Sequence, residues 1–236
     1  MTGGASQVVV VTGATGATGR ATCAALLAQG HRVVAVGRDE SSLGALVDEL
    51  AAGDASRVAL LETRVCDLRD GDAVRALAGD VVRAFGRVDG LFHLVGGWAG
   101  TDRFTDSTDE QWRELSGNLV DTLRHTTIAF HDALLASGRG RVAIVSAAAA
   151  GTPTAGNAAY ASAKAAAETW LRALADSFAA AEATPGSAAV TGVVKWIGSG
   201  RTATTPAALA DWLVGLLDTD AAELNGRRVE LWPTTA

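Results

Sequence analysis

Tyr160 and Lys164 are the residues whose spacing first suggests chemistry, because the one tyrosine of the chain stands four residues before a lysine. Residues at i and i+4 of a helix share one face, so the phenol and the ammonium are expected to lie close together. A free phenol has a pKa of about 10, and a neighbouring ammonium favours the phenolate, so we expect this pKa to be lowered. Such a phenol can protonate a carbonyl oxygen or take the proton back. An ordinary surface Tyr and Lys would show the same spacing.

A glycine-rich segment near the start of the chain predicts a nucleotide-binding turn. The apolar run Val8–Val11 leads into Gly13, Gly16 and Gly19, which stand three residues apart. Glycine lets a pyrophosphate approach the backbone, and the following helix offers free N–H groups to the phosphates. The spacing differs from the common GxGxxG pattern, and a tight connection without a ligand is the alternative. The predicted cofactor contacts in this turn are Gly13, Thr15, Gly16, Ala17, Thr18 and Gly19.

The residues that follow the next three predicted strands refine the cofactor prediction. An acidic residue after the second strand of a dinucleotide fold binds the ribose 2′-hydroxyl, whereas an arginine accommodates a 2′-phosphate. Arg38 in this place favours NADP(H) over NAD(H), with a solvated surface arginine as the alternative. Asp67, followed by Leu68, can accept a hydrogen bond from the adenine amino group or can cap the next helix. Val95 and Gly96 are expected to let the backbone approach the cofactor.

These residues lie in a chain that alternates regularly between two kinds of segment. Short β-branched runs, several of them continuously apolar, alternate with longer alanine- and leucine-rich segments at helical spacing. This alternation predicts a doubly wound α/β fold, in which ligands bind beyond the carboxyl ends of the strands. The predicted strands are Val8–Val11, Arg32–Val36, Val58–Leu61, Gly90–Val95, Val142–Ser146, Ala189–Val194 and Arg228–Trp232. The predicted helices cover 17–29, 40–51, 70–85, 108–136, 157–182 and 205–217, with a loop at 179–188.

Length and composition exclude several classes of protein. The 236 residues fit one α/β domain, so 1–236 is expected to be a single domain. A formal net charge of −6 gives no support to nucleic-acid binding, and no apolar stretch is long enough to span a bilayer. Two cysteines and four histidines without ligand spacing predict neither a disulfide framework nor a metal site. The residues before Val8 lack the basic region of a secretion signal, so a cytoplasmic location is expected, and the composition is typical of a GC-rich bacterial genome.

Asn118 completes a series of residues whose order and separations are those of a known family. The series consists of Thr12, Gly13, Gly16, Gly19, Asp67, Gly96, Asn118, Tyr160 and Lys164. In this order it resembles the short-chain dehydrogenase/reductase family, and the resemblance covers almost the whole chain. It implies a seven-stranded parallel Rossmann sheet with helices on both faces, NAD(P) binding, and a Tyr160–Lys164 proton relay in which Lys164 also holds the nicotinamide ribose. It also implies that Asn118 anchors a water chain to Lys164, the alternative being a polar residue exposed on a helix.

The chain departs from the family pattern around the substrate. The usual Asn-Asn-Ala-Gly after the fourth strand is replaced by His93–Gly96. Counting back from Tyr160 at the family's spacing reaches Ala147, so we expect the adjacent Ser146 to orient the substrate carbonyl. Losing one such donor costs on the order of 3 kcal/mol in well-studied enzymes.

The segment after the sixth predicted strand also differs from the family. Lys195–Gly198 replaces the usual Pro-Gly, with Ile197 as the expected cofactor contact, and the substrate loop near 195–206 is short. Trp98 and Trp196 both follow strands and are expected to flank the nicotinamide side, as a clamp for an apolar or aromatic substrate. Packing of either tryptophan under a short loop is the alternative.

Three functions fit these patterns. The first is an NADPH-dependent reductase of a carbonyl or imine, with Tyr160 as proton donor. The second is a non-redox dehydratase or cyclase built on the same site, and the third is a subunit that binds NADP(H) without turnover. The family resemblance further implies that the helices carrying Asn118 and Tyr160 form an interface, so a homodimer or homotetramer is expected.

Overall fold

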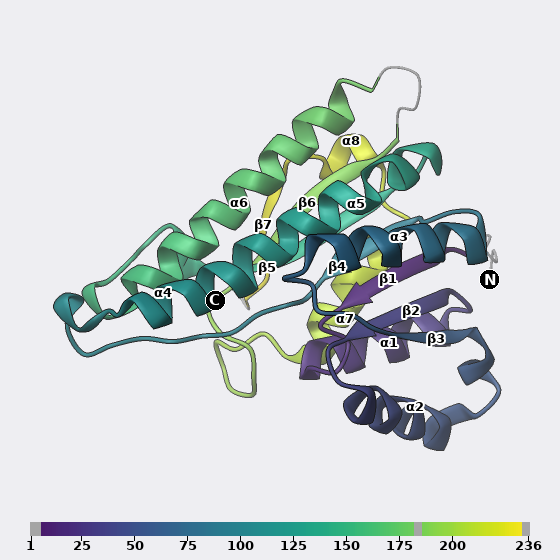
Figure 1. The fold of residues 1–236 in the computed structure, drawn as a ribbon, viewed down its shortest axis with the longest axis horizontal. Helices are drawn as coiled ribbons and strands as arrows, with labels where there is room; N and C mark the ends of the chain where they lie inside the picture. The colour runs from purple at the N-terminus through teal and green to yellow at the C-terminus, as the bar shows by residue number, and fades with distance from the viewer. Residues whose placement is uncertain (1–5, 182–185, 233–236) are drawn as a thin grey trace.

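The structure is a computed structural model that describes residues 6–181 and 186–232. Its centre is a seven-stranded parallel sheet in the order β3-β2-β1-β4-β5-β6-β7 (Figure 1). The sheet confirms the predicted doubly wound α/β fold. The strands are β1 (Val8–Thr12), β2 (Arg32–Gly37), β3 (Leu61–Val65), β4 (Gly90–His93), β5 (Arg141–Ala147), β6 (Ala188–Val194) and β7 (Arg228–Glu230).

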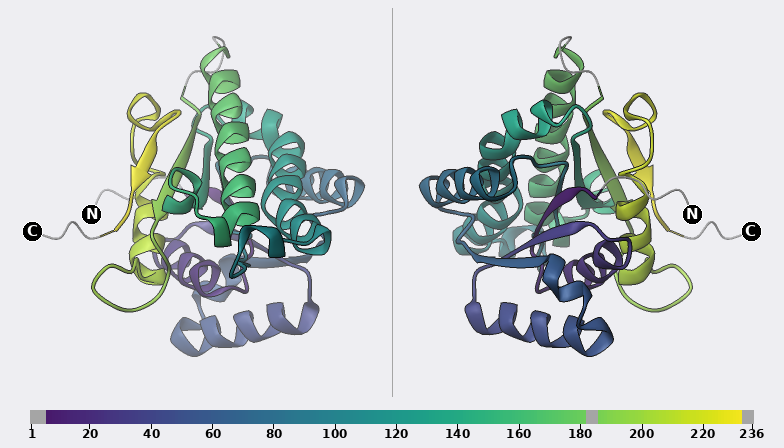
Figure 2. Two further views of the ribbon diagram at one scale, coloured as in Figure 1. Left: turned by 90° about the vertical axis from the view of Figure 1, so that its left-hand side faces the viewer. Right: turned by 90° about the vertical axis from the view of Figure 1, so that its right-hand side faces the viewer.

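Helices cover both faces of the sheet, as the two side views show (Figure 2). Alternate residues of β1 point to opposite faces, so Val10 packs with Leu77, Phe130 and Leu171 on one face while Val11 packs on the other. Burial on both faces explains why β1 is a continuous run of valines. One layer contains α3 (Gly71–Phe85), α4 (Asp109–Ser116), α5 (Thr122–Ala136) and α6 (Ala158–Ala179), and the other contains α1 (Ala17–Ala28), α2 (Glu40–Asp54) and α7 (Pro206–Gly215).

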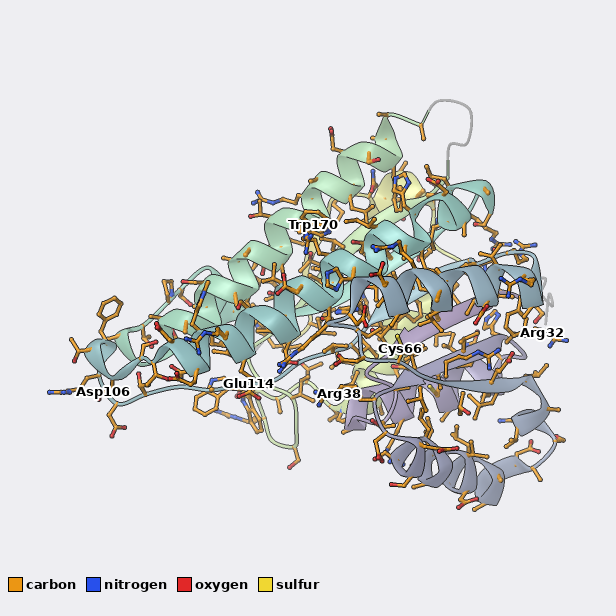
Figure 3. All side chains as sticks on the ribbon, in the orientation of Figure 1. Arg32, Arg38, Cys66, Asp106, Glu114 and Trp170 are labelled. Carbon is orange, nitrogen blue, oxygen red and sulfur yellow. The ribbon has the colours of Figure 1, made fainter. Side chains whose placement is uncertain are left out.

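The order of the strands reverses between β1 and β4, and this reversal places the site. The chain moves outward from β1 to β2 and β3, then returns to pair β4 with the other side of β1. The carboxyl ends of β1 and β4 therefore lie side by side, with Thr12 opposite His93. The connections that leave these ends diverge to opposite faces and open a crevice. Arg38 and Cys66 lie at this edge of the sheet, whereas Arg32 lies at the opposite edge (Figure 3).

The structure corrects the third predicted strand. The segment predicted as a strand at Val58–Leu61 forms a 3₁₀ turn at Arg57–Leu60, and β3 runs from Leu61 to Val65. The strand lies at the edge of the sheet and, within the described residues, pairs with β2 alone, so its side chains are less buried than those of a central strand. The strand contains Glu62 and Arg64, so it lacks the continuous apolar run from which a buried strand is predicted.

The predicted helix at 108–136 is also divided. Helix α4 ends at Ser116, a π-helical turn covers Gly117–Asp121, and α5 begins at Thr122. The other predicted helices agree with the structure to within a few residues. A short helix, α8 (Ala221–Leu224), precedes β7. The predicted loop at 179–188 includes residues 182–185, which lie outside the described residues, and within the described ranges no helix is long and apolar enough to cross a membrane.

Candidate functional site

The turn after β1 has the shape that a phosphate-binding turn requires. Gly13 has φ +67°, in the left-handed region, and a Cβ on it would lie 2.7 Å from the carbonyl oxygen of Leu94. A Cβ on Gly19 would lie 2.3 Å from the carbonyl oxygen of Gly13, so glycine there lets α1 pack directly on the turn. Gly16 is the N-cap of α1 and supplies no side-chain cap. The first N–H groups of α1 are thus available to an anion.

A cavity of about 290 Å³ opens beside this turn. Its wall is formed by the turn after β1, by the residues that follow β2 and β3, and by the segment after β4. Nine residues singled out from the sequence line it, and they are Gly13, Thr15, Gly16, Arg38, Asp67, Leu68, Val95, Gly96 and Asn118. Asp67 does not cap α3, since the side chain of Asp70 accepts from the N–H groups of Asp72 and Ala73. Asp67 instead accepts from the N–H of Arg69 at 3.0 Å.

A larger cavity of about 570 Å³ adjoins the first, and Leu94, Val95 and Gly96 line both. It contains the remaining predicted site residues except Ala17 and Gly19, which line neither cavity. These are Thr18, Trp98, Ser146, Tyr160, Lys164, Trp196 and Ile197. The two cavities form one crevice along the carboxyl edge of the sheet, of a size suited to a dinucleotide and a small substrate.

Tyr160 and Lys164 share the wall of the larger cavity, one helical turn apart on α6. The ammonium of Lys164 lies 5.9 Å from the centroid of the Tyr160 ring and donates to the carbonyl oxygen of Val145 at 2.7 Å. The expected lowering of the Tyr160 pKa is wrong for this arrangement, because burial raises the pKa of the phenol above its ordinary value. The ammonium is hydrogen-bonded to a backbone carbonyl and not to the phenol oxygen, so burial dominates.

Lys164 is itself tuned by its surroundings. Its side chain is buried, and burial lowers the pKa of the ammonium to about 8. The carboxylate of Glu168, the next residue at helical spacing, opposes this effect and raises the pKa of Lys164. The balance leaves Lys164 with a pKa near neutrality, where a change in a neighbouring charge alters its protonation.

Ser146 is buried at the end of β5 and forms a network with two charged residues. Its hydroxyl donates to Oε1 of Glu168 at 2.6 Å, and Arg228 donates to Oε2 of the same carboxylate at 3.0 Å. A serine hydroxyl has one proton, so Ser146 has to turn away from Glu168 before it can donate to a substrate. Ala147, the next residue, also lines the larger cavity and carries no hydroxyl.

Asn118 lies in the π-helical turn between α4 and α5. Its side-chain oxygen accepts from Arg69 at 2.9 Å, and its backbone carbonyl accepts from the hydroxyl of Thr122 at 2.6 Å. Asn118 lines the smaller cavity with Arg38, and the structure does not bring it into the larger cavity with Tyr160. A water chain from Asn118 to Lys164 therefore stays a prediction.

His93, at the end of β4, links this strand to β1 and to α5. Its Nδ1 lies 2.9 Å from the hydroxyl of Thr12 and 3.2 Å from that of Thr126, and its Nε2 lies 3.1 Å from that of Thr122. Burial, reinforced by the charge of Lys164, lowers the pKa of His93 to about 3. The ring is therefore neutral and ties the end of β1 to the start of α5 next to the turn that carries Asn118.

The two tryptophans stand at the mouth of the larger cavity. Trp98 is 72% exposed and Trp196 is 47% exposed, and both line the cavity. The short connection after β6 is closed by hydrogen bonds from the N–H of Gly198 to the carbonyl of Thr204 and from the N–H of Thr204 to the carbonyl of Trp196, each 3.1 Å. Trp196 packs partly on this segment, where its indole N–H donates to the hydroxyl of Thr202 at 3.3 Å. The exposed parts of both indole rings place apolar surface on the wall of the larger cavity.

Several residues near the crevice were not predicted from the sequence. Glu168 repeats the i, i+4 spacing that links Tyr160 to Lys164, so the helical period could have indicated it. Asn157 lines the larger cavity from the residue before α6, three positions before Tyr160. Arg69 reaches Asn118 across 49 positions of the chain, and only the folded structure shows that contact.

Comparisons with known proteins agree with this geometry. The family model for short chain dehydrogenases matches residues 7–197. A Streptomyces virginiae protein named as a ketoacyl reductase of the monensin polyketide synthase is 35% identical over 148 residues, which cover 60% of this chain and 53% of that protein. The chain thus spans about half of that relative's length.

Two solved structures share the fold. An NADPH-bound short chain oxidoreductase from Pseudomonas aeruginosa, described as containing an atypical catalytic center, superposes with a TM-score of 0.85 at 23% identity and covers 95% of each chain. An NAD⁺-bound xylitol dehydrogenase also gives a TM-score of 0.85, at 17% identity, over 97% of this chain and 98% of the other. The chain belongs to the short-chain dehydrogenase family of oxidoreductases. The fold of this family binds a nicotinamide cofactor.

Proposed function

We propose that this protein is an NADPH-dependent oxidoreductase that reduces a carbonyl or imine group of a small, apolar or aromatic substrate. The observation that carries the proposal is the placement of Tyr160 and Lys164 on the wall of a cavity that continues into the glycine-lined crevice. The phenol of Tyr160, the ammonium of Lys164 and the glycine-rich turn after β1 thus lie at the same edge of the sheet.

The residues of the crevice fit a dinucleotide. Glycine at positions 13 and 19 lets the turn after β1 and the start of α1 pack closely, because a Cβ at either position would clash with backbone atoms. The uncapped start of α1 would offer its N–H groups to a pyrophosphate. In this proposal Thr15, Gly16, Ala17 and Thr18 complete the turn around the phosphates, Asp67 and Leu68 bind the adenine, and Val95, Gly96 and Ile197 hold the nicotinamide half. A bound nicotinamide cofactor supplies the hydride that reduces the substrate carbon.

The catalytic step then depends on three side chains of this protein. Tyr160 gives its phenolic proton to the substrate oxygen, and Lys164 stabilises the negative charge that develops on that oxygen and on the phenol. Ser146 is assigned to the orientation of the substrate, after its hydroxyl turns from Glu168. Asn118 is assigned to the proton path behind Lys164. Trp98 and Trp196 are assigned to the apolar face of the substrate.

The choice of NADPH rests on Arg38. This guanidinium is exposed at the end of β2, on the wall of the smaller cavity, with Arg69 on the same wall. The side chain of Asp39 turns back to the N-terminus of α2, where it accepts from the N–H of Ser42 at 2.7 Å. A 2′-phosphate bound beside Arg38 would meet positive charge, while the carboxylate of the adjacent Asp39 is engaged at the start of α2.

The second candidate is a non-redox dehydratase or cyclase that keeps Tyr160 as its acid. It is favoured by one observation, the hydrogen bond that engages the Ser146 hydroxyl with Glu168 and leaves the carbonyl-binding side short of a donor. We also propose a homodimer or homotetramer in the cytoplasm. A hollow of about 340 Å³ on α5 and α6, which includes Ile128 and Trp170, is the surface that another copy would cover.

One experiment tests the reductase against its alternative. The purified protein is incubated with NADPH or NADH and a panel of aromatic aldehydes, aryl ketones and β-keto esters, and the loss of reduced nicotinamide is followed by absorbance. Substrate-dependent oxidation of NADPH is the expected result. Conversion of an added β-hydroxy ester to the α,β-unsaturated ester, with loss of water and no change in the nicotinamide, would instead support the dehydratase. The absence of both reactions would contradict both functions.

A further inference from the structure

A carbonyl reductase needs a hydrogen-bond donor for the substrate oxygen besides Tyr160, and the two residues at the end of β5 leave none free. Ala147 has no polar side chain, and the single proton of the Ser146 hydroxyl is engaged by Glu168 at 2.6 Å. The carboxylate of Glu168 is largely buried and is held by Arg228, so it stays an acceptor at the back of Ser146. A donor that is free without breaking the Ser146–Glu168 hydrogen bond therefore has to come from another part of the cavity wall.

Asn157 has the required group in a fixed orientation. It ends the 3₁₀ turn Ala155–Asn157 and directly precedes α6, where its side-chain oxygen accepts from the N–H of Thr154 at 2.7 Å. A backbone N–H can only donate, so the amide oxygen has to face Thr154 and the NH₂ group is turned to the other side. Among the hydrogen bonds of the described residues, the Asn157 side chain takes part through its oxygen and not through this NH₂ group.

Asn157 lines the same cavity as the reacting group. Asn157 is the N-cap of α6 and stands three residues before Tyr160, so it adjoins the first turn of the helix that carries the phenol. Both residues line the larger cavity together with Lys164 and Ala147. The cap on Thr154 holds the amide without using its donor, so the NH₂ group is preorganised at no cost when the substrate binds.

We infer that the side-chain NH₂ of Asn157 is the second hydrogen-bond donor to the substrate carbonyl oxygen and replaces the hydroxyl that Ala147 lacks. The inference rests on the proposed reductase function and adds no covalent step. Asn157 keeps both of its protons. Tyr160 still gives the proton that completes the alcohol, while the amide stabilises the negative charge on oxygen as the carbon is reduced.

Two substitutions separate the donor from the structural role of the same side chain. Asn157→Asp keeps an oxygen for the N–H of Thr154 but removes the NH₂ donor and adds a negative charge. Asn157→Ala removes the oxygen and the donor and adds no charge. With the carbonyl compound of the panel that wild type reduces fastest, we expect kcat to fall about 100-fold in both variants, as it does when one oxyanion donor is lost, with a smaller change in KM. Ala147→Ser, added to either variant, supplies the missing hydroxyl and is expected to raise kcat again by at least about tenfold.

The other outcomes overturn the inference. A loss confined to Asn157→Asp would indicate repulsion by the new charge, and a loss confined to Asn157→Ala would indicate the lost cap. Unchanged kcat in both variants, with a loss in Ser146→Ala, would assign the donor to Ser146. Urea unfolding of Asn157→Asp is expected to match wild type, so an equal loss of stability and of kcat would also count against a donor role. If wild type reduces no member of the panel, the proposed function itself fails.

Discussion

The ammonium of Lys164 lies 5.9 Å from the centroid of the Tyr160 ring, over the ring and not against the phenol oxygen. A hydrogen bond of 2.7 Å to the carbonyl of Val145 holds it there. Lys164 is thus fixed to β5 while Tyr160 faces the cavity, and the pair resembles a phenol beside a buried positive charge more than a hydrogen-bonded ion pair. The proton transfer that we propose depends on this arrangement.

The first prediction concerns the proton donor itself. Tyr160→Phe removes the phenolic proton and keeps the ring, so we expect kcat/KM for carbonyl reduction to fall by about 100- to 10,000-fold. Binding of NADPH, measured by calorimetry, should change little. Thr169→Ala, on the exposed side of the same helix, is the control and should retain wild-type activity.

The second prediction concerns the pH at which activity is lost on the alkaline side. Glu168 raises the pKa of Lys164, which burial lowers to about 8. Glu168→Gln removes this effect, so the alkaline limb of the kcat/KM profile should move to lower pH. Arg228→Gln removes the positive partner of the same carboxylate and should move the limb to higher pH. Shifts in the same direction in both variants would contradict this account.

The third prediction concerns stability in acid. The pKa of His93 is about 3 in the folded protein and about 6.5 in an unfolded chain, so the unfolded state binds more protons between these values. The contribution of His93 to stability is therefore present above pH 6.5 and is lost as the pH falls towards 3, by about 2 kcal/mol between pH 7 and pH 5. His93→Asn should lack this part of the decrease. Urea unfolding of both proteins at the two pH values measures it, and equal decreases would refute it.

The fourth prediction concerns the choice of cofactor. Arg38→Asp replaces a positive charge on the wall of the smaller cavity by a negative one, so the Kd for NADPH should rise about 10- to 100-fold while that for NADH stays similar or falls. Arg32→Asp is the matched control, since Arg32 is exposed at the opposite end of the same strand (Figure 3). Fluorescence titration of the reduced cofactors measures both. An equal change for NADPH and NADH would remove the argument for a 2′-phosphate site.

The fifth prediction concerns assembly. Ile128 on α5 is 55% exposed beside Trp170 on α6, and together they border the hollow on these helices. A charge there opposes burial against a second copy, so Ile128→Glu should shift the protein towards the monomer in light scattering. Val65→Glu places the same charge on an exposed residue of β3 and should leave the mass unchanged. A wild-type protein that is monomeric at all concentrations would rule out the proposed oligomer.

The fold class and most residues of the crevice follow from the amino-acid sequence alone. Continuous valine runs identify strands buried on both faces, and residues that follow such strands must gather at one edge of a parallel sheet. For this reason the sequence places four residues in one crevice, namely Gly13, Arg38, Asp67 and Gly96. Tyr160 and Lys164 could be paired because helical geometry alone brings them together.

Other features arise only in the folded chain, because local periodicity does not encode them. An edge strand is stabilised by its neighbour and not by its own apolar pattern, so β3 was misplaced. The direction of the Ser146 hydroxyl depends on Glu168, 22 positions away, and that carboxylate is held by Arg228, 60 positions further on. The pKa of Tyr160 follows from burial, which is a property of the packed cavity. Hydrogen-bond direction and desolvation arise only when distant segments pack, so the detailed chemistry of the site had to be read from the fold.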